Sequence, residues 1–297
     1  MQSDQLRALA AIVDHGTFEG AARQLHVTAS AISQRIKALE TQLGQVVVRR
    51  TVPCRATEAG EVLLRMARQL QVLEADALAE LDLESLASTD LPLSVNADAL
   101  ATWFRSVLES VAGWGDTVLR LSIEDQGHSS RLLRSGEVIG AITSDPVAVH
   151  GCSIESLGAM RYLPVATPEL RERFTKGRGP DWNRMPVIRF NSKDDLQQRV
   201  LAGHDVHATP PTHQVPASEG FLAAVHAGLG WGMVPTDQLG DALETGALVR
   251  LAQRDHIDVP LYWQVWRLTS PRIDRVTAAI RTAAVALRSQ TVTLRSH

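Results

Sequence analysis

The sequence has few of the features that place a protein outside the cell or in a membrane. It contains only two cysteines, Cys54 and Cys152, which lie far apart and provide no disulfide framework. Its longest apolar runs, such as GFLAAVHAGLGWGMV, are interrupted by charge, histidine or glycine before they reach the length of a membrane span. The start MQSDQLRALA lacks the basic and apolar regions of a signal peptide, so we expect a cytoplasmic protein.

The sequence also lacks a strong excess of positive charge. Its formal net charge of −3 excludes a general affinity for polyanions, so any nucleic-acid-binding surface must be local. Residues 1–60 contain seven Lys or Arg against five Asp or Glu, whereas residues 61–85 contain two against six. A weakly basic segment therefore precedes an acidic one, and the length of 297 residues predicts two or three domains.

Three short helices are predicted in residues 1–44. The first has apolar residues at helical spacing and ends at His15-Gly16. Thr17 is the predicted N-cap of the second, whose small residues allow close packing, and Thr28 is the predicted N-cap of the third. Gly44 ends the third helix as a left-handed cap. We expect its buried stripe to contain Ile32, Ile36, Leu39 and Leu43.

The opposite face of the third predicted helix is polar. Ser33, Gln34 and Lys37 follow Ser30 at i+3, i+4 and i+7, so all four residues share one face. Hydroxyls and amides can read base edges in the major groove, and a lysine can bind a phosphate or a guanine. A solvated helix face is the plain alternative, but the preceding small-residue helix, the short turn and the following basic loop favour DNA binding. The candidate residues on this helix are Thr28, Ser30, Ser33, Gln34, Arg35 and Lys37.

The loop VVVRRTVPCRATEAG, residues 46–60, is the predicted wing of such a domain. Residues 46–48 suit a short strand, and Pro53 prevents further helix. Arg49, Arg50 and Arg55 cluster in the turn, where they can contact the DNA backbone or the minor groove. We interpret Cys54 in this turn as a small buried packing residue rather than a redox switch.

The motifs of this segment resemble a known family. The order A-A-x-x-L, S-A-I-S-x-x-I-x-x-L-E-x-x-L-G, R and T-E-A-G is similar to the winged helix-turn-helix of LysR-type transcriptional regulators over residues 2 to 60. Many members have Leu-Phe-Glu-Arg where this chain has residues 47–50, VVRR. That difference, together with PCRATE at residues 53–58, resembles the LysG/ArgP subgroup, which controls export of basic amino acids. The resemblance implies a double-stranded DNA operator, a small-molecule effector with no other cofactor, RNA polymerase as a partner, and a homodimer that can pair into a homotetramer.

A long helix is predicted from Thr57 to about residue 87. Its apolar residues are spaced by 3, 4, 3, 4 and 4, which is typical of a coiled-coil seam. Packing of this helix on its own domain is the alternative, but the next predicted domain begins only at Leu91. We therefore expect the seam to pair two chains, so that two DNA-binding domains reach two half-sites. The predicted dimerisation residues are Leu63, Met66, Leu70, Leu73 and Leu81.

Strand and helix patterns alternate after Pro92, with the last helical pattern before the final strands near 236–244, which predicts an α/β fold with mostly parallel sheets. Combined with the resemblance, the pattern implies an effector domain of two Rossmann-like lobes with a cleft between them, similar to periplasmic binding proteins. The predicted divisions are a winged helix-turn-helix at 1–58, a linker helix at 59–88, lobe I at 91–163 plus 267–297, and lobe II at 164–266.

Ligands of such sheets bind beyond the carboxyl ends of the strands, at helix N-termini. Four acidic residues at these positions, Asp98, Glu124, Asp125 and Asp145, suit an amino acid with an extra positive charge, either lysine or arginine. Helix capping is the plain alternative for each acid, although two adjacent acids exceed what one cap needs. The candidate effector-binding residues are Ser94, Asn96, Asp98, Glu124, Asp125, Thr143, Ser144, Asp145, Asn191, Ser218 and Glu219.

The remaining histidine and aromatic clusters indicate solvation and packing rather than a further site. His204, His207 and His213 are more simply solvated loop residues than a metal site, and Trp103, Phe104, Trp263 and Trp266 are expected in the core. No catalytic motif is present, so an enzyme is not expected. The sequence therefore predicts a ligand-responsive DNA-binding transcription regulator. The alternatives are an effector-independent nucleoid or replication-control protein, an enzyme, and a thiol-based sensor using Cys54 and Cys152.

Overall fold

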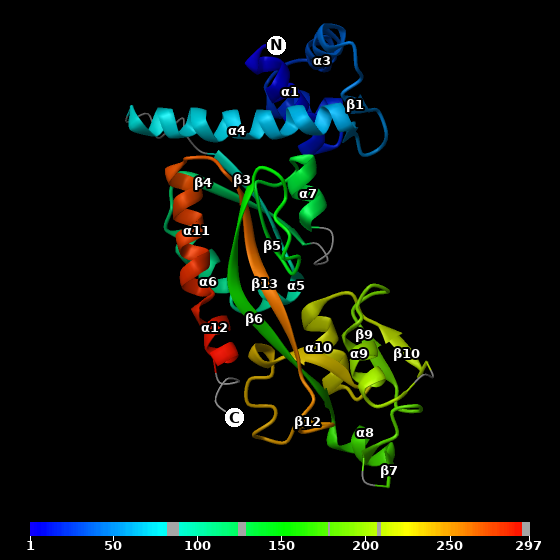
Figure 1. Cartoon of the computed structure of the whole chain (residues 1–297). Helices are drawn as coiled ribbons and strands as arrows, with labels where there is room; N and C mark the ends of the chain where they lie inside the picture. The colour runs from blue at the N-terminus through cyan, green and yellow to red at the C-terminus, as the bar shows by residue number, and fades with distance from the viewer. Residues whose placement is uncertain (82–88, 124–128, 178, 207–208, 293–297) are drawn as a thin grey trace. The chain divides into compact units, whose positions relative to one another are not determined.

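A computed structural model of the chain describes residues 1–81, 89–123, 129–177, 179–206 and 209–292 (Figure 1). The chain divides into two compact units: residues 1–96, 109–155 and 262–279 form the first, and residues 97–108, 156–261 and 280–297 form the second. Two of the boundaries fall inside long strands, β6 (Cys152–Ala166) and β13 (Ile257–Trp266), and the predicted division into two lobes remains a prediction. Within the described residues, no helix is long and apolar enough to cross a membrane.

The N-terminal helices follow the predicted caps. Helices α1 (Ser3–His15), α2 (Phe18–Gln24) and α3 (Ala29–Leu43) form the head, and its core is built by residues such as Leu9, Ile12, Ile32 and Ile36. The Thr17 hydroxyl accepts the N–H of Gly20 at 2.9 Å, and the Thr28 hydroxyl accepts the N–H of Ala31 at 3.1 Å. Gly16 and Gly44 end α1 and α3 with φ of 68° and 67°. The prediction that Leu43 is buried is wrong: it is 40% exposed, because it lies in the last turn of α3, outside the core of the head.

The wing is a two-stranded antiparallel hairpin of β1 (Val48–Arg49) and β2 (Arg55–Ala56). It begins two residues later than the predicted strand, and Val46 is exposed. Val47 and Val48 are buried in the core of the head, so the hairpin is anchored at its base.

Helix α4 (Glu58–Glu80) begins at the predicted cap, Thr57, whose hydroxyl accepts the N–H of Gly60 at 3.1 Å. It is the long cyan helix of Figure 1. Its buried face packs on its own chain, where Leu64 and Ala67 form a cluster with Leu6 and Ala10 of α1. The prediction that the apolar stripe of this helix pairs two chains therefore missed these contacts, because α4 also packs an apolar face on its own unit.

In the first unit, strand β3 (Thr89–Val95) pairs in parallel with β4 (Thr117–Ile123) and β5 (Gly140–Thr143). Strand β13 pairs with β5 in antiparallel register, Tyr262 opposite Thr143. Helix α7 (Ser129–Ser135) contacts α4, β3 and β5. Helices α6 (Arg105–Ala112) and α11 (Pro271–Ala283) each contribute residues to both units.

In the second unit, β6 pairs with β11 (Gly232–Pro235) and β12 (Val249–Arg250) in antiparallel register, and β9 (Val187–Arg189) pairs with β10 (Thr212–Gln214) in parallel. A further hairpin joins β7 (Thr175–Lys176) to β8 (Gly179–Pro180). The helices are α5 (Ala97–Ala101), α8 (Pro168–Arg173), α9 (Leu196–Gly203), α10 (Ser218–His226) and α12 (Val285–Val292).

The α/β class is confirmed, but two details differ from prediction. The sheets are mixed rather than mostly parallel, because the neighbours of the long strands β6 and β13 include antiparallel partners. The helix expected at 236–244 is only the short 3₁₀ turn Thr236–Gln238. The expected core aromatics Trp103, Phe104, Trp263 and Trp266 are all buried.

Candidate DNA-binding surface and effector site

The polar face of α3 points away from the core of the head. Gln34 and Lys37 are exposed and Ser33 is half-buried, whereas Ile32 and Ile36 on the other side are fully buried. Thr28 and Ser30, at the start of the helix, are exposed as well. The side chains predicted to read bases are therefore accessible to a duplex, and their contacts with DNA remain a prediction.

Arg35 differs from its neighbours because its guanidinium is already engaged. Its Nη2 atom lies 3.0 Å from a carboxylate oxygen of Asp4 in α1. This ion pair fixes α3 to the first helix of the head, so the geometry favours a structural role for Arg35 in the free protein.

All three wing arginines are exposed. Arg49 and Arg55 are opposite one another in the hairpin, which places two cations on one short ladder. The guanidinium of Arg50 lies 4.9 Å from the centre of the Phe18 ring at the start of α2. A cation held over an aromatic face loses less freedom when it binds a phosphate, so the wing and α2 together orient this arginine.

Both cysteines are buried. Cys54 belongs to the core of the head, and its backbone N–H donates to the carbonyl oxygen of Gly16 at 2.7 Å. Burial raises the pKa of the Cys152 thiol to about 11, so little of the reactive thiolate exists near neutral pH. Neither environment favours a thiol-based sensor.

The predicted dimerisation stripe is divided between two surroundings. Leu63 and Leu70 are partly buried against the head, so contacts within one chain account for these two positions of the stripe. Met66, Leu73 and Leu81 are 39%, 43% and 67% exposed. These three residues leave an apolar surface on α4 for a second copy, and dimerisation through it remains a prediction.

In the first unit, the candidate effector residues lie around the start of α7. The hydroxyls of Ser94 and Ser129 are 3.1 Å apart, and the Ser130 hydroxyl donates to a carboxylate oxygen of Asp145 at 3.2 Å. Asp145 also accepts the N–H of Val147 at 2.9 Å, and its own N–H donates to the Thr143 hydroxyl at 3.0 Å. The carboxylate of Asp145 thus stabilises a local turn in the described segment between β5 and β6, where no helix begins. Two further candidates of this unit are Asn96, which is buried, and Ser144, which is half-buried.

In the second unit, Asp98 is the centre of a polar network. Its carboxylate accepts hydrogen bonds from the hydroxyls of Ser218 at 2.6 Å and Tyr162 at 2.8 Å. The Ser218 hydroxyl in turn accepts a hydrogen bond from the side-chain amide of Gln238 at 2.6 Å. These contacts join the starts of α5 and α10 to β6 and to the 3₁₀ turn after β11.

The electrostatics of this network disfavour a lone negative charge. Burial raises the pKa of the Asp98 carboxyl, the hydrogen bonds from Ser218 and Tyr162 lower it, and the charge of Asp194 raises it further, with an upward shift as the result. Burial and the neighbouring Asp98 also raise the pKa of Tyr162 well above its usual value, so the phenol stays a donor. By surface area Asp98 is only half-buried as a residue, but its carboxyl group is enclosed.

The remaining candidates do not join this network. The side-chain oxygen of Asn191 accepts the N–H groups of Lys193 and Asp194 at 2.8 and 3.2 Å, which is a local turn. Glu219, the second residue of α10, has a side chain that is 86% exposed and lies 3.5 Å from Arg105, so its role in effector binding stays a prediction without support from this network. Glu124 and Asp125 are the two adjacent acids that exceed what one helix cap needs. Both lie outside the described residues.

Two members of the network were not predicted. Tyr162 is one of only two tyrosines in the chain and belongs to a fully buried stretch of β6. A hydroxyl in such a stretch needs a partner, and this was the signal that could have identified it. Gln238 carried no such signal, because it follows a strand in a segment predicted to be an ordinary helix.

The histidine cluster does not form a metal site among the residues that can be described. The imidazole Nε2 of His204 lies 2.5 Å from Asp255, and the ring stacks on Trp182 with centroids 4.8 Å apart. His207 falls outside the described part of the chain, and His213 is half-buried in β10. No group of three potential metal ligands occurs in the part of the chain that the structure describes.

Two family profiles match consecutive parts of the chain. The profile described as "Bacterial regulatory helix-turn-helix protein, lysR family" matches residues 3–61, and the profile "LysR substrate binding domain" matches residues 73–288. These matches confirm the predicted winged helix-turn-helix and the periplasmic-binding-protein-like effector domain.

Individual proteins extend the similarity over nearly the whole length. The lysine export transcriptional regulatory protein LysG of Corynebacterium efficiens is 47% identical over 288 residues, which cover 96% of this chain and 99% of that protein. The crystal structure of ArgP from Mycobacterium tuberculosis superposes with a TM-score of 0.83 at 48% identity, covering 97% of this chain and 98% of that one. Full-length LysG from Corynebacterium glutamicum, with arginine bound as its effector, gives a TM-score of 0.76 at 44% identity and covers 96% and 99%.

Proposed function

This chain belongs to the LysR family of bacterial regulatory proteins, and from that premise we propose that it binds arginine or lysine and thereby controls a gene for the export of basic amino acids. It is a DNA-binding regulator with a domain for a small-molecule effector. The relatives support the nature of the effector: one is named for lysine export, and another holds arginine.

The observation that carries the proposal is the surroundings of Asp98. Its carboxylate accepts two hydrogen bonds from neutral hydroxyls, and the charged residue that most affects its pKa is another acid, Asp194. An enclosed carboxylate without a cation is costly unless a ligand supplies the positive charge. The side-chain cation of a basic amino acid is such a charge.

A second carboxylate of the same unit provides the contrast. Asp258 accepts two hydrogen bonds from Arg161, at 2.8 and 2.9 Å, so its charge is already balanced within the protein. Asp98 has neutral donors at similar distances, which hold the carboxylate in place and leave its charge for a ligand.

The DNA-binding half of the proposal depends on α3 and the wing. The exposed polar side chains of α3 would read the operator, while Arg49, Arg50 and Arg55 would bind phosphates. Pairing through the exposed residues of α4 would bring two heads to two half-sites. The effector can shift the arrangement of the heads only by its differential affinity for two states, typically about 1–3 kcal/mol.

Isothermal titration calorimetry with four amino acids tests the proposal. Arginine and lysine have a side-chain cation, whereas citrulline and norleucine are neutral analogues of similar size. We expect only the cationic ligands to bind tightly. Asp98→Asn should weaken their binding at least about 30-fold, because removal of one partner of an enclosed charge pair costs about 2 kcal/mol or more.

Asp258→Asn is the matched control, since it removes the same charge from a carboxylate that already has a cation. We expect this variant to bind arginine with wild-type affinity. Equal binding of arginine to wild type and Asp98→Asn would refute the assignment of Asp98. Absence of arginine and lysine binding, with DNA binding intact, would favour the effector-independent nucleoid or replication-control protein.

A further inference from the structure

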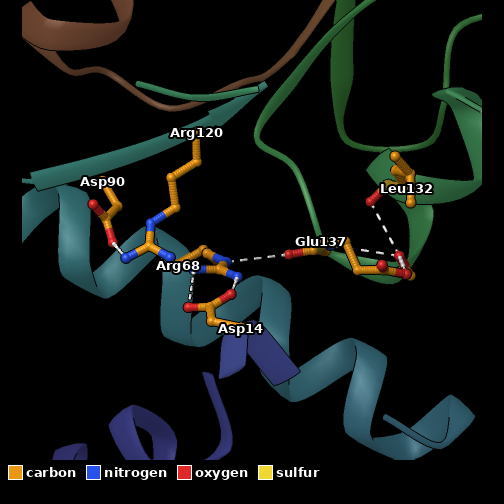
Figure 2. Close-up of polar contacts among 8 residues, drawn as sticks. Asp14, Arg68, Asp90, Arg120, Leu132 and Glu137 are labelled. Carbon is orange, nitrogen blue, oxygen red and sulfur yellow. Dashed lines mark hydrogen bonds and ion pairs between the residues drawn. The ribbon is translucent and has the colours of Figure 1, made fainter. Parts of the chain in front are cut away.

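Helix α4 makes a buried ionic contact between the head and the rest of the first unit. The guanidinium of Arg68 donates from Nη1 to one carboxylate oxygen of Asp14 at 3.0 Å and from Nη2 to the other. Its Nε lies 3.5 Å from the carbonyl oxygen of Gly136. Figure 2 shows Arg68 between Asp14 on one side and the turn that carries Glu137 on the other. The Arg68 side chain is only 4% exposed, so this contact is shielded from solvent.

The turn at Gly136 is fitted closely to α4. Gly136 has φ of +77°, and a Cβ there would lie 2.6 Å from Cγ and 2.7 Å from the backbone nitrogen of Arg65. Arg65 donates from its guanidinium to the carbonyl oxygen of Arg134 in α7. The C-terminal end of α7 is therefore in direct contact with the backbone and with two arginines of α4.

The other end of α7 meets candidate effector residues. Ser129 contacts Ser94, and Ser130 donates to Asp145. Helix α7 has only seven residues, so at about 1.5 Å per residue its two ends lie about 10 Å apart. A displacement at Ser129 and Ser130 would therefore move the Gly136 turn as well.

A second ion pair lies beside the same carboxylate. Arg120 of β4 is 2.7 Å from Asp90 of β3, and Figure 2 shows this pair next to Arg68 and Asp14. The sheet that holds Ser94 is thus linked to the same charged cluster as α1 of the head.

We propose that α7 responds to an effector bound at the candidate residues Ser94 and Asp145 and transmits this occupancy to the DNA-binding head through Arg68. The guanidinium is planar, so the direction of Nε fixes the directions of Nη1 and Nη2. A shift of the Gly136 carbonyl would therefore turn the fork that holds Asp14 and change the seating of α1 on α4. This inference rests on the proposed function for the identity of the effector.

The test replaces the pair by neutral side chains of similar size, in the double variant Asp14→Asn and Arg68→Met. Replacing both partners avoids leaving one buried charge alone, which is strongly destabilising. The matched control is Arg7→Met with Glu74→Gln, since this 2.7 Å pair also joins α1 to α4 but is exposed and does not contact α7.

Two measurements are compared among wild type, double variant and control. Calorimetry gives the affinity for arginine, and fluorescence anisotropy gives the affinity, with and without arginine, for a duplex that the wild type selects from a random library. We expect arginine to change the DNA affinity of wild type and control by about 5- to 150-fold. In the double variant, this factor should fall at least about fivefold while arginine affinity stays within about twofold of wild type.

An unchanged factor in the double variant, meaning the same change of DNA affinity on adding arginine as in wild type, would overturn the inference.

If the wild type itself binds neither arginine nor lysine, the proposed function fails. Hydrogen exchange of α1 in the ligand-free protein then tests whether Arg68 holds α1. There we expect at least about fivefold faster exchange in the double variant than in the control, since a buried pair holds α1 and an exposed pair contributes little. Equal rates would contradict the role of Arg68. Should the double variant not fold, Arg68→Lys keeps the charge but loses the fork, and the same outcomes apply.

Discussion

The polar face of α3 and the network around Asp98 place charge in opposite surroundings. On α3 and the wing, Lys37 and the arginines of the hairpin are exposed, so solvent screens their charges in the free protein. Around Asp98, an enclosed carboxylate is held by neutral hydroxyls and its pKa is raised by burial. The exposed cations cost the free protein little stability, whereas the enclosed carboxylate reduces its stability until a cationic ligand binds.

This difference predicts which ligand has the larger effect on folding. An exposed cation contributes little to the stability of the free protein, and DNA binding there adds long-range, salt-dependent attraction. An enclosed carboxylate reduces stability in the ligand-free state, so a cationic ligand removes a cost as well as adding contacts. Variants of each surface test this difference.

The largest effect is expected from pH at the Asp98 network. A cation binds the ionised carboxylate, so arginine affinity should fall, by up to about tenfold per pH unit, as pH decreases below the raised pKa of Asp98. For the ligand-free protein, the raised pKa means that the folded state binds more protons than the unfolded state between the two pKa values. The contribution of this carboxyl to stability therefore decreases as pH rises through that interval.

Asp98→Asn should raise the melting temperature at pH 7, as differential scanning fluorimetry can check, and should remove the pH dependence of arginine binding. A lower melting temperature in Asp98→Asn would contradict the comparison.

The next effect is expected on α3, where it is confined to a single base pair. Gln34→Ala should reduce discrimination at one base pair by about 5- to 150-fold, since a good bidentate contact contributes about 1–3 kcal/mol of discrimination. Binding to non-cognate DNA should stay unchanged. Sequencing of the duplexes that each variant selects measures the effect, and Gln42→Ala, exposed near the end of the same helix, is the control. An unaltered selected sequence would remove Gln34 from the reading face.

The smallest effect is expected in the wing. Arg50→Ala should weaken binding to all duplexes similarly and reduce the slope of log affinity against log salt by about 1, the value for one phosphate contact. Arg173→Ala is a matched control, because this arginine also lies over an aromatic ring, that of Phe174 at 5.4 Å, but on α8. An equal salt slope in Arg50→Ala and wild type would show that Arg50 does not bind phosphate.

Much of the head could be predicted from sequence because its signals are local. A threonine cap, a glycine with positive φ and an apolar stripe each act within one or two turns, so residue type and spacing suffice to identify Thr28, Gly44 and Ile36. Leu43 was misassigned because the stripe continues in sequence beyond the end of the core. The second face of α4 was missed because the packing of Leu64 and Ala67 depends on α1, which is distant in sequence.

The residues of the candidate effector site could be predicted only in part from the sequence. The rule that ligands bind at strand ends selected Asp98 and Ser218, but it also selected Glu219, which faces solvent, and Asn191, which forms a turn. Only long-range contacts distinguish among these residues. Tyr162 and Gln238 reach Asp98 and Ser218 across 64 and 20 residues of sequence, and no local pattern specifies which hydroxyl meets which carboxylate.

The sequence alone thus determined the helices of the head, their caps and the polar row on α3, since these features depend on backbone preferences and spacing within a few residues. The tertiary structure alone decided which acid is enclosed by neutral donors among the described residues and which arginine joins α1 to the Gly136 turn. Both outcomes depend on burial, and burial is a property of residues far apart in the chain that share one small volume.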